Sequence, residues 1–310
     1  IKNVSLYGVC DFDNKKCELL KKKFPNLVIF KNAKSLIKNK FINLVSIASY
    51  DSFHFEHAKT CAMNKKNFFV EKPICLKSSE LQILKKITSK NKIKFSTNFN
   101  LRTSKIFLNL KKKLNNDKKI LPYFIEGDYN SGRLYKLLEG WRGEEKYHSV
   151  VLGCSVHLVD LICWILDEYP VEVSGFENKI VTKNTTFKFA DFSYATLKFK
   201  SGVICKITAN SGCVHPHFHN LNLYSKKFTF INSIGGTYFL TPGKKVKIKK
   251  INSNLYKKRN RGMVIKSFVN QLLGKSKAIV DKDEIFKVMS ICFSIIESTQ
   301  VSKKIKVKYI

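Results

Sequence analysis

The first hundred residues alternate short apolar runs with amphipathic segments. The segments between the apolar runs have the periodicity of amphipathic helices. Strands that alternate with helices are typical of βαβ units and a parallel sheet. We therefore expect a doubly wound domain over residues 1–100. Its strands are predicted at 4–10, 27–30, 44–48, 68–70 and 93–97, and its helices at 14–24, 54–64 and 79–90, with a short helix between the second and third strands.

The pattern changes beyond residue 100. An amphipathic helix over 101–117 and a strand over 120–129 precede a glycine-containing loop at 131–149 and an apolar helix at 151–167. Successive strands separated by turn signals then follow from 171 to 250, which is typical of a second, mainly antiparallel sheet. Two helices (262–273 and 282–298) and a last strand close the chain. We expect an α/β protein in which residues 101–310 form a C-terminal α+β domain with a large open sheet.

The net charge of +34 suggests a nucleic-acid or membrane-surface partner at first sight. However, only five of the 57 basic residues are Arg, whose planar fork is the usual reader of phosphates and bases. Dispersed Lys with abundant Asn, Ile and Phe also fits a compositionally skewed genome, and we prefer that account. Neither a nucleic-acid partner nor a membrane is predicted. The clusters at 244–250 and 257–261 stay open as anion patches, the first alternatively as a strand with one solvated face.

Nine cysteines are spread along the chain, mostly in apolar runs, and no CxxC pair occurs. An odd number without paired spacing favours buried free thiols over a disulfide framework or a zinc knuckle. A reducing cytoplasm is the expected location. His157 and Asp160 interrupt the most apolar window, 150–166, which argues for a buried globular helix rather than a membrane span.

Val70-Glu71-Lys72-Pro73 joins an apolar strand to a charged pair and a proline. Proline restricts the residue before it, so Lys72 is biased toward an extended conformation. Ligands of open α/β sheets bind beyond the carboxyl ends of the strands, which would place Lys72 beside a ligand. An ordinary surface Lys before a turn proline is the alternative.

Asp11 follows the first predicted strand. An acid at this position can bind an adenosine ribose and would repel a 2′-phosphate, which favours NAD over NADP. A turn or helix-capping residue is the alternative. Gly8 is the only glycine before Gly127, so the glycine-rich phosphate turn of a dinucleotide site is absent. We expect that turn to lie upstream of Ile1, in a segment removed by truncation, unless the site does not exist.

Imidazoles are the remaining candidates. On a helix, Asp160 shares a face with His157 and could orient it, although a lone His on an apolar helix can equally be a core residue. His215, His217 and His219 have strand period two and could bind zinc, but Pro216 interrupts them and no acid is near, so no metal site is predicted.

These motifs together resemble the glucose-fructose oxidoreductase and inositol dehydrogenase family (Gfo/Idh/MocA). The resemblance runs in order from Val9 to about Leu166, through these segments: Val9-Cys10-Asp11, the stretch from Ile47 to His54, Val70-Glu71-Lys72-Pro73, the stretch from Asn98 to Arg102, Trp141-Arg142, and His157-Leu158-Val159-Asp160-Leu161. It implies a Rossmann domain, a C-terminal open-sheet domain that often mediates homo-oligomer formation as a dimer or tetramer, and NAD(P)-dependent chemistry at a sugar or polyol carbon.

The resemblance also implies roles for residues. Lys72 and His157 would be catalytic, Lys72 beside the nicotinamide and His157 as general acid/base, with both facing one cavity. The expected cofactor ligands are Asp11, Ser49, His54, Glu71 and Arg142, and the expected substrate ligands are Arg102, Tyr129 and Asp160. Hydride leaves a carbinol carbon as its hydroxyl proton is removed, so a group titrating near neutrality is needed within hydrogen-bond reach.

The chain departs from the family pattern before and within the apolar helix. Tyr147-His148-Ser149 replaces three glycines, and Gly153 replaces an Asp four residues before His157. Despite these departures, the resemblance implies an NAD(P)-dependent dehydrogenase acting on CH-OH groups. The alternative is a non-catalytic scaffold of the same fold with a basic, anion-binding surface.

Overall fold

The computed structural model describes residues 1–310 except 2, 118 and 252–261. The chain forms two compact units, one containing Ile1–Asn98 and Val264–Ile285, the other Phe99–Met263 and Phe286–Ile310. The first boundary falls close to the expected one at residue 100. Residues 264–285, which lie in the range expected for the second domain, cluster with the first unit.

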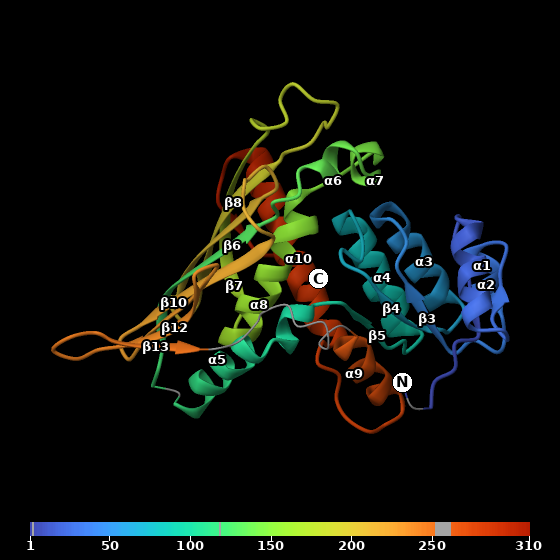
Figure 1. Cartoon of the computed structure of the whole chain (residues 1–310), viewed down its shortest axis with the longest axis horizontal. Helices are drawn as coiled ribbons and strands as arrows, with labels where there is room; N and C mark the ends of the chain where they lie inside the picture. The colour runs from blue at the N-terminus through green and yellow to red at the C-terminus, as the bar shows by residue number, and fades with distance from the viewer. Residues whose placement is uncertain (2, 118, 252–261) are drawn as a thin grey trace. The chain divides into compact units, whose positions relative to one another are not determined.

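The first unit alternates strands and helices, as predicted (blue to cyan in Figure 1). Its strands form a parallel pair, β1-β2, and a parallel three-stranded sheet, β3-β4-β5. The first predicted strand, 4–10, is regular only at Gly8 and Val9. The elements in chain order are β1 (Gly8–Val9), α1 (Asn14–Lys23), β2 (Val28–Ile29), α2 (Ala33–Lys38), β3 (Leu44–Ile47), α3 (Asp51–Met63), β4 (Asn67–Val70), α4 (Ser78–Lys90) and β5 (Phe95–Thr97), joined later by α9 (Met263–Leu272).

Apolar strands hold this unit together. Phe68 and Phe95 lie opposite one another on β4 and β5 and stack with centroids 4.9 Å apart. Phe268 of α9 packs on Phe69, and the Ser96 hydroxyl donates to the Val280 carbonyl. These contacts join residues 199 and 184 positions apart, and they explain why residues 264–285 belong to the first unit.

The second unit is built on one nine-stranded sheet, with strand order β13-β12-β11-β10-β6-β9-β8-β7-β14. All neighbours are antiparallel except β6 and β9. The prediction of a mainly antiparallel sheet is confirmed. The strands are β6 (Pro122–Asn130), β7 (Pro170–Asn178), β8 (Phe192–Phe199), β9 (Ile204–Asn210), β10 (Phe218–Ser225), β11 (Thr229–Ser233), β12 (Gly236–Thr241), β13 (Lys247–Ile251) and β14 (Ile305–Lys306).

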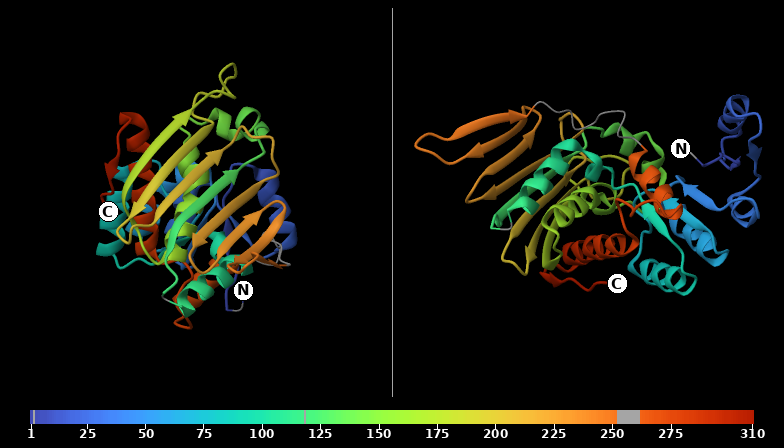
Figure 2. Two further views of the ribbon diagram at one scale, coloured as in Figure 1. Left: turned by 90° about the vertical axis from the view of Figure 1, so that its left-hand side faces the viewer. Right: turned by 90° about the horizontal axis from the view of Figure 1, so that it is seen from below.

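Helices cover one face of this sheet, and Figure 2 (left) shows the opposite face turned toward the viewer. A side chain added at Gly127 of β6 would meet Leu158 and Ile162 of α8, and one at Gly175 of β7 would meet Ile295 and Thr299 of α10. The helical elements are a 3₁₀ turn at Asn100–Thr103, α5 (Lys105–Asn116), α6 (Tyr135–Leu138), α7 (Trp141–Glu144), a π-helical turn at Val151–Ser155, α8 (Val156–Leu166) and α10 (Lys282–Val301).

The interpretation of the basic cluster at 244–250 as a strand is confirmed in part. Residues 247–250 lie in β13 (Lys247–Ile251), the exposed edge strand of the sheet, whereas 244–246 precede it. The other basic cluster, 257–261, lies outside the described residues. No helix among the described residues combines the length and apolarity that a membrane crossing requires.

Candidate active site

In the first unit, the carboxyl ends of three parallel strands are tied to one another. The Glu71 amide donates to the Ile47 carbonyl at the end of β3 (2.9 Å), and the Thr97 hydroxyl donates to the Val70 carbonyl at the end of β4 (2.7 Å). The amide of Asn98 also donates to the Glu71 carboxylate (2.9 Å). Glu71 is thereby fixed at the sheet edge where open α/β proteins bind ligands.

Lys72 follows Glu71, is half-buried, and is joined to Pro73 by a cis peptide bond. Ile74 and Cys75 continue this turn into the core, so the Lys72 backbone is held on both sides. The structure therefore places an amine at the carboxyl end of β4, as the sequence predicts.

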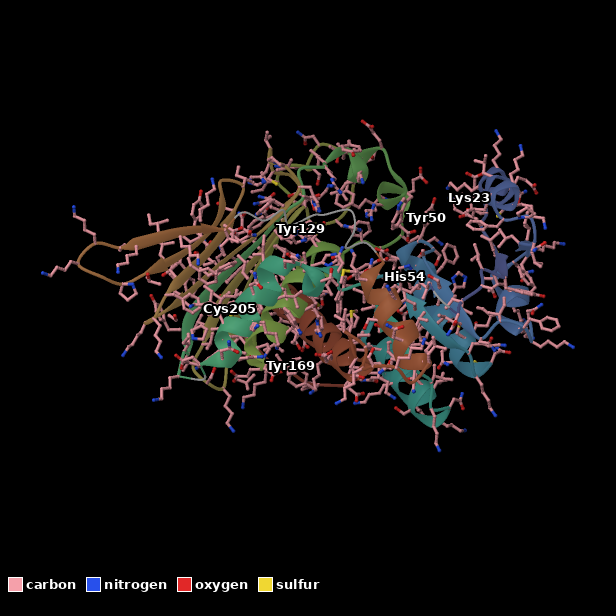
Figure 3. The ribbon with its side chains drawn as sticks, turned by 60° about the horizontal axis from the view of Figure 1, so that its bottom comes forward. Lys23, Tyr50, His54, Tyr129, Tyr169 and Cys205 are labelled. Carbon is pink, nitrogen blue, oxygen red and sulfur yellow. The ribbon has the colours of Figure 1, made fainter. Side chains whose placement is uncertain are left out.

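Ser49 lies in the adjoining loop after β3, and His54 lies in the first turn of α3, which follows that loop. The His54 ring is 1% exposed and contacts two backbone carbonyls, those of Pro73 (2.7 Å) and Ser49 (2.9 Å). The Ser49 hydroxyl lies 3.1 Å from Nδ1 of His57, which follows His54 by one turn of α3. His54 (labelled in Figure 3), expected among the cofactor ligands, thus contacts the backbone of the β3 loop and of the β4 turn.

Asp11 lies beyond β1 on the surface. Its carboxylate accepts from the backbone amide of Asp13 (2.9 Å), and Asp13 in turn caps α1. This is the turn geometry named as the alternative, and it leaves the exposed carboxylate accessible to a ligand. Phe12 contacts Tyr50 edge-on at 5.5 Å, so the loops after β1 and β3 lie side by side.

In the second unit, four aromatic and imidazole rings pack together. Tyr129 of β6 stacks on His157 at the start of α8, with centroids 6.1 Å apart and planes within 9°. His219 of β10 is the direct cross-strand partner of Tyr129 and packs edge-on against it at 4.5 Å. His217 lies 5.3 Å from both Tyr129 and His219. We call Tyr129, His157, His217 and His219 the ring cluster.

The ring cluster differs from the zinc arrangement considered above. His217 and His219 do face the same way, but His215 lies ahead of β10 and donates to the Pro216 carbonyl. Across the described ranges, no group of three or more His, Cys, Asp or Glu residues has metal-binding geometry. His217 and His219 enter the candidate site instead as neighbours of Tyr129, a role that sequence spacing alone did not indicate.

Arg102 and Asp160 form a buried ion pair. Nε of Arg102 lies 3.1 Å from both Asp160 oxygens and Nη2 lies 2.7 Å from Oδ1. Arg102 is 2% exposed and Asp160 is fully buried. The pair ties the 3₁₀ turn to α8 one turn after His157. Both residues were expected to bind substrate; because each is buried against the other, we instead propose that they position α8.

Arg142 lies on α7 in the loop before α8, with its guanidinium 4.3 Å from the ring centroid of Trp141. His148 is buried next to Phe187, and a Cβ added at Gly153 would lie 3.5 Å from its ring. An imidazole therefore borders the position where the resemblance expects an Asp. His148 lies three residues before the π-helical turn at Val151–Ser155, which hydrophobic periodicity does not reveal.

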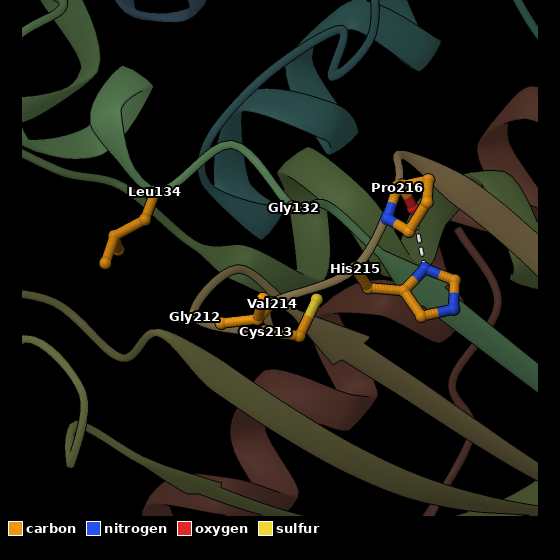
Figure 4. A pocket seen from close by; sticks show the side chains of 7 residues that line it. All are labelled: Gly132, Leu134, Gly212, Cys213, Val214, His215 and Pro216. Carbon is orange, nitrogen blue, oxygen red and sulfur yellow. Dashed lines mark hydrogen bonds between the residues drawn. The ribbon is translucent and has the colours of Figure 1, made fainter.

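An open hollow of about 470 Å³ also lies in the second unit (Figure 4). Its lining comes from the start of the 131–149 loop and from the segment before β10: Gly132, Leu134, Gly212, Cys213, Val214, His215 and Pro216. Gly132 has φ +57°, and a Cβ there would lie 1.6 Å from the His215 carbonyl oxygen. Only glycine permits this close approach of the two segments.

A parallel-sheet unit followed by a unit with one large open sheet is the architecture typical of two-domain proteins that bind a dinucleotide at the strand ends of the first unit. Comparison with protein families makes this specific. Residues 2–99 match the model described as "Oxidoreductase family, NAD-binding Rossmann fold" (Gfo/Idh/MocA), and residues 112–231 match the Gfo/Idh/MocA C-terminal domain. The chain belongs to this family.

Individual relatives are distant. The chain is 24% identical over 233 residues to myo-inositol 2-dehydrogenase of Thermotoga maritima, which covers 73% of this chain and 67% of the relative. It is 24% identical over 106 residues to scyllo-inositol 2-dehydrogenase (NADP(+)) of Bacillus subtilis, covering 34% and 30%. The crystal structure of myo-inositol 2-dehydrogenase from Lactobacillus plantarum superposes with a TM-score of 0.81 at 19% identity, covering 99% and 93%.

Proposed function

We propose that this oxidoreductase transfers hydride between a nicotinamide dinucleotide and a carbinol carbon of a sugar, sugar derivative or polyol. The observation that supports the proposal is the set of bonds at the ends of β3, β4 and β5, which fixes Glu71, the residue before Lys72, at the sheet edge where open α/β proteins bind ligands. The relatives named as inositol dehydrogenases support the substrate class.

The residues present fit the nicotinamide and ribose parts of the cofactor. Asp11 carries an exposed carboxylate for a ribose, and Ser49, Glu71 and Arg142 supply polar groups on the loops that would border the cofactor. The pyrophosphate turn has no counterpart, because Gly8 is the only glycine before Gly127. When bound, the dinucleotide would supply the hydride acceptor or donor. We favour NAD, since the Asp11 carboxylate would repel a 2′-phosphate, although one relative is named as NADP-dependent.

In the proposed mechanism, His157 removes the hydroxyl proton of the substrate, and the Lys72 ammonium stabilises the developing alkoxide. The ring cluster would bind the substrate, because aromatic faces contact C–H groups and imidazole nitrogens hydrogen-bond hydroxyls. The two catalytic residues belong to different units, and their meeting at one site stays a prediction.

Substitution of His157 tests this mechanism. His157→Ala should lower turnover about 10²- to 10⁴-fold, the usual contribution of a positioned acid/base, while the folded fraction stays unchanged. Unchanged turnover in an active preparation would remove His157 from the mechanism. His215→Ala, outside the ring cluster, is the matched control.

The charge of +34 favours one second candidate, a non-catalytic scaffold that binds an anionic polymer. Fluorescence titration with NADH separates the two, because a dehydrogenase gives saturable quenching and a scaffold gives none. Polyanion binding by a scaffold would also weaken steeply with salt.

We further propose a cytoplasmic homo-oligomer. The nine free cysteines, seven of them buried, suit a reducing compartment, and the face of the nine-stranded sheet opposite the helices offers a surface for a second copy. Light scattering of the purified chain tests the assembly: a mass of about 36 kDa would indicate a monomer.

A further inference from the structure

Two loops at the candidate cofactor edge are joined by one imidazole. Nε2 of His54 lies 2.9 Å from the carbonyl oxygen of Ser49, after β3, and Nδ1 lies 2.7 Å from that of Pro73, after β4. We propose that His54 is a positioning residue that carries a proton on both nitrogens and clamps these two loops together. The inference goes beyond the proposed function and holds for the fold whether or not a dinucleotide binds.

The chemistry of the two acceptors requires the charged form. A backbone carbonyl oxygen accepts hydrogen bonds and donates none. A neutral imidazole has one N–H, so it could satisfy one carbonyl and would direct a nitrogen lone pair at the other. Rotating the ring by 180° places carbon atoms against both oxygens and loses both bonds. Only the imidazolium donates at both distances, and charge-assisted donors form the stronger bonds.

The second imidazole of α3 behaves differently. Burial and, next, the nearby charge of His54 lower the pKa of His57, which therefore stays neutral near pH 7 and can accept from the Ser49 hydroxyl. Ser49 is thus held at its carbonyl by His54 and at its hydroxyl by His57. One charged and one neutral imidazole on successive turns fix the same loop residue.

The charge environment is mixed. β3 and β4 carry no titratable side chain, and Glu80 at the start of α4 is engaged with the amides of Leu76 and Lys77. The remaining titratable groups on the adjoining segments are Tyr50, Asp51, Glu56, His57, Lys59 and Cys61 in the β3 loop and α3, and Glu71, Lys72, Cys75 and Lys77 in and after the β4 turn. Two carbonyl dipoles, rather than a paired carboxylate, are the groups that the ring contacts directly.

The consequence concerns Lys72. Pro73 is its direct neighbour, so a bond to the Pro73 carbonyl restrains the backbone that presents the amine. Releasing the clamp would let the β4 turn move relative to the β3 loop without changing either strand.

Nuclear magnetic resonance on the complete chain tests the protonation state. In ¹⁵N-labelled protein at pH 7.5, two-bond correlations should show both His54 nitrogens protonated, with His54→Gln identifying the signal. A single protonated nitrogen on His54 would overturn the inference, whether or not the protein binds a dinucleotide.

A second experiment separates positioning from folding. His54→Phe keeps a ring but removes both donors, and we expect the NADH dissociation constant to rise about tenfold while the variant keeps a cooperative thermal transition. His215→Phe, which replaces an imidazole of the second unit that contacts neither loop, is the control and should leave NADH affinity unchanged. Equal NADH affinity in the two variants would refute the positioning role. If His54→Phe does not fold, the resonance experiment still decides.

Discussion

The Arg102–Asp160 pair offers the most direct test of how the second unit is built. Both side chains are buried, and two guanidinium nitrogens face one carboxylate. Removing one member of a buried pair leaves an uncompensated charge, which costs about 3–5 kcal/mol. We therefore expect Arg102→Met and Asp160→Leu each to lower the unfolding free energy of this unit by about that amount.

The double variant should behave differently. Replacing both charges by apolar side chains of similar volume is often neutral or stabilising, so Arg102→Met with Asp160→Leu should recover most of the loss. Glu172→Gln, which removes the half-buried partner of the exposed Lys304, is the control and should change stability by less than about 0.5 kcal/mol.

The chain itself provides the probe. Its two tryptophans, Trp141 and Trp164, both belong to the second unit, and Trp164 lies beside the Arg102 guanidinium at 5.9 Å. Urea unfolding followed by tryptophan fluorescence therefore reports on the correct unit. Single variants that unfold within about 1 kcal/mol of the parent, or a double variant as unstable as the sum of the singles, would refute the account of a buried ion pair.

Three further outcomes are expected. His219→Phe keeps the ring packing but removes the nitrogens, so KM for a polyol substrate should rise about tenfold while His215→Phe leaves it unchanged; equal KM values would exclude the ring cluster from binding. Gly132→Ala should lower the thermal midpoint more than Gly202→Ala, because both positions have positive φ but only the first places a Cβ against a carbonyl; equal shifts would contradict this. Burial raises the pKa of Cys61 from 9.0 to about 12, so the folded state keeps a proton that the unfolded state loses, and stability should fall as pH rises from 9 toward 12. Cys61→Ala should flatten that slope in alkaline urea titrations, and an unchanged slope would exclude this thiol.

Local pattern was enough to predict the fold class. Alternating apolar and amphipathic segments predicted the parallel unit, and turn signals at 200–202, 233–236 and 241–243 each fall between strands that pair in the second sheet. The strand after residue 4 is shorter than predicted. Periodicity did not detect the π-helical turn at Val151–Ser155, because its spacing differs from that of an α-helix.

The candidate site was harder to predict because its contacts are long-range. Tyr129 meets His219 through the register of β6 and β10, which lie 90 residues apart, and no local pattern encodes that register. The Arg102–Asp160 bond joins residues 58 positions apart. The family resemblance did name His54 as a residue of the cofactor site, but its two carbonyl acceptors depend on how the β3 loop and the β4 turn are folded.

The pairing of β6 delays completion of the large sheet during synthesis of the chain. This strand lies inside the large sheet, yet its only neighbours, β9 and β10, end at Asn210 and Ser225. A nascent or prematurely terminated chain that stops after β8 leaves both edges of β6 bare, with their amides and carbonyls available to another molecule. Translation must therefore continue about 100 residues past β6 before the ribosome has supplied both partners, and chaperone protection during that interval would matter more for this chain than for one assembled from neighbouring hairpins.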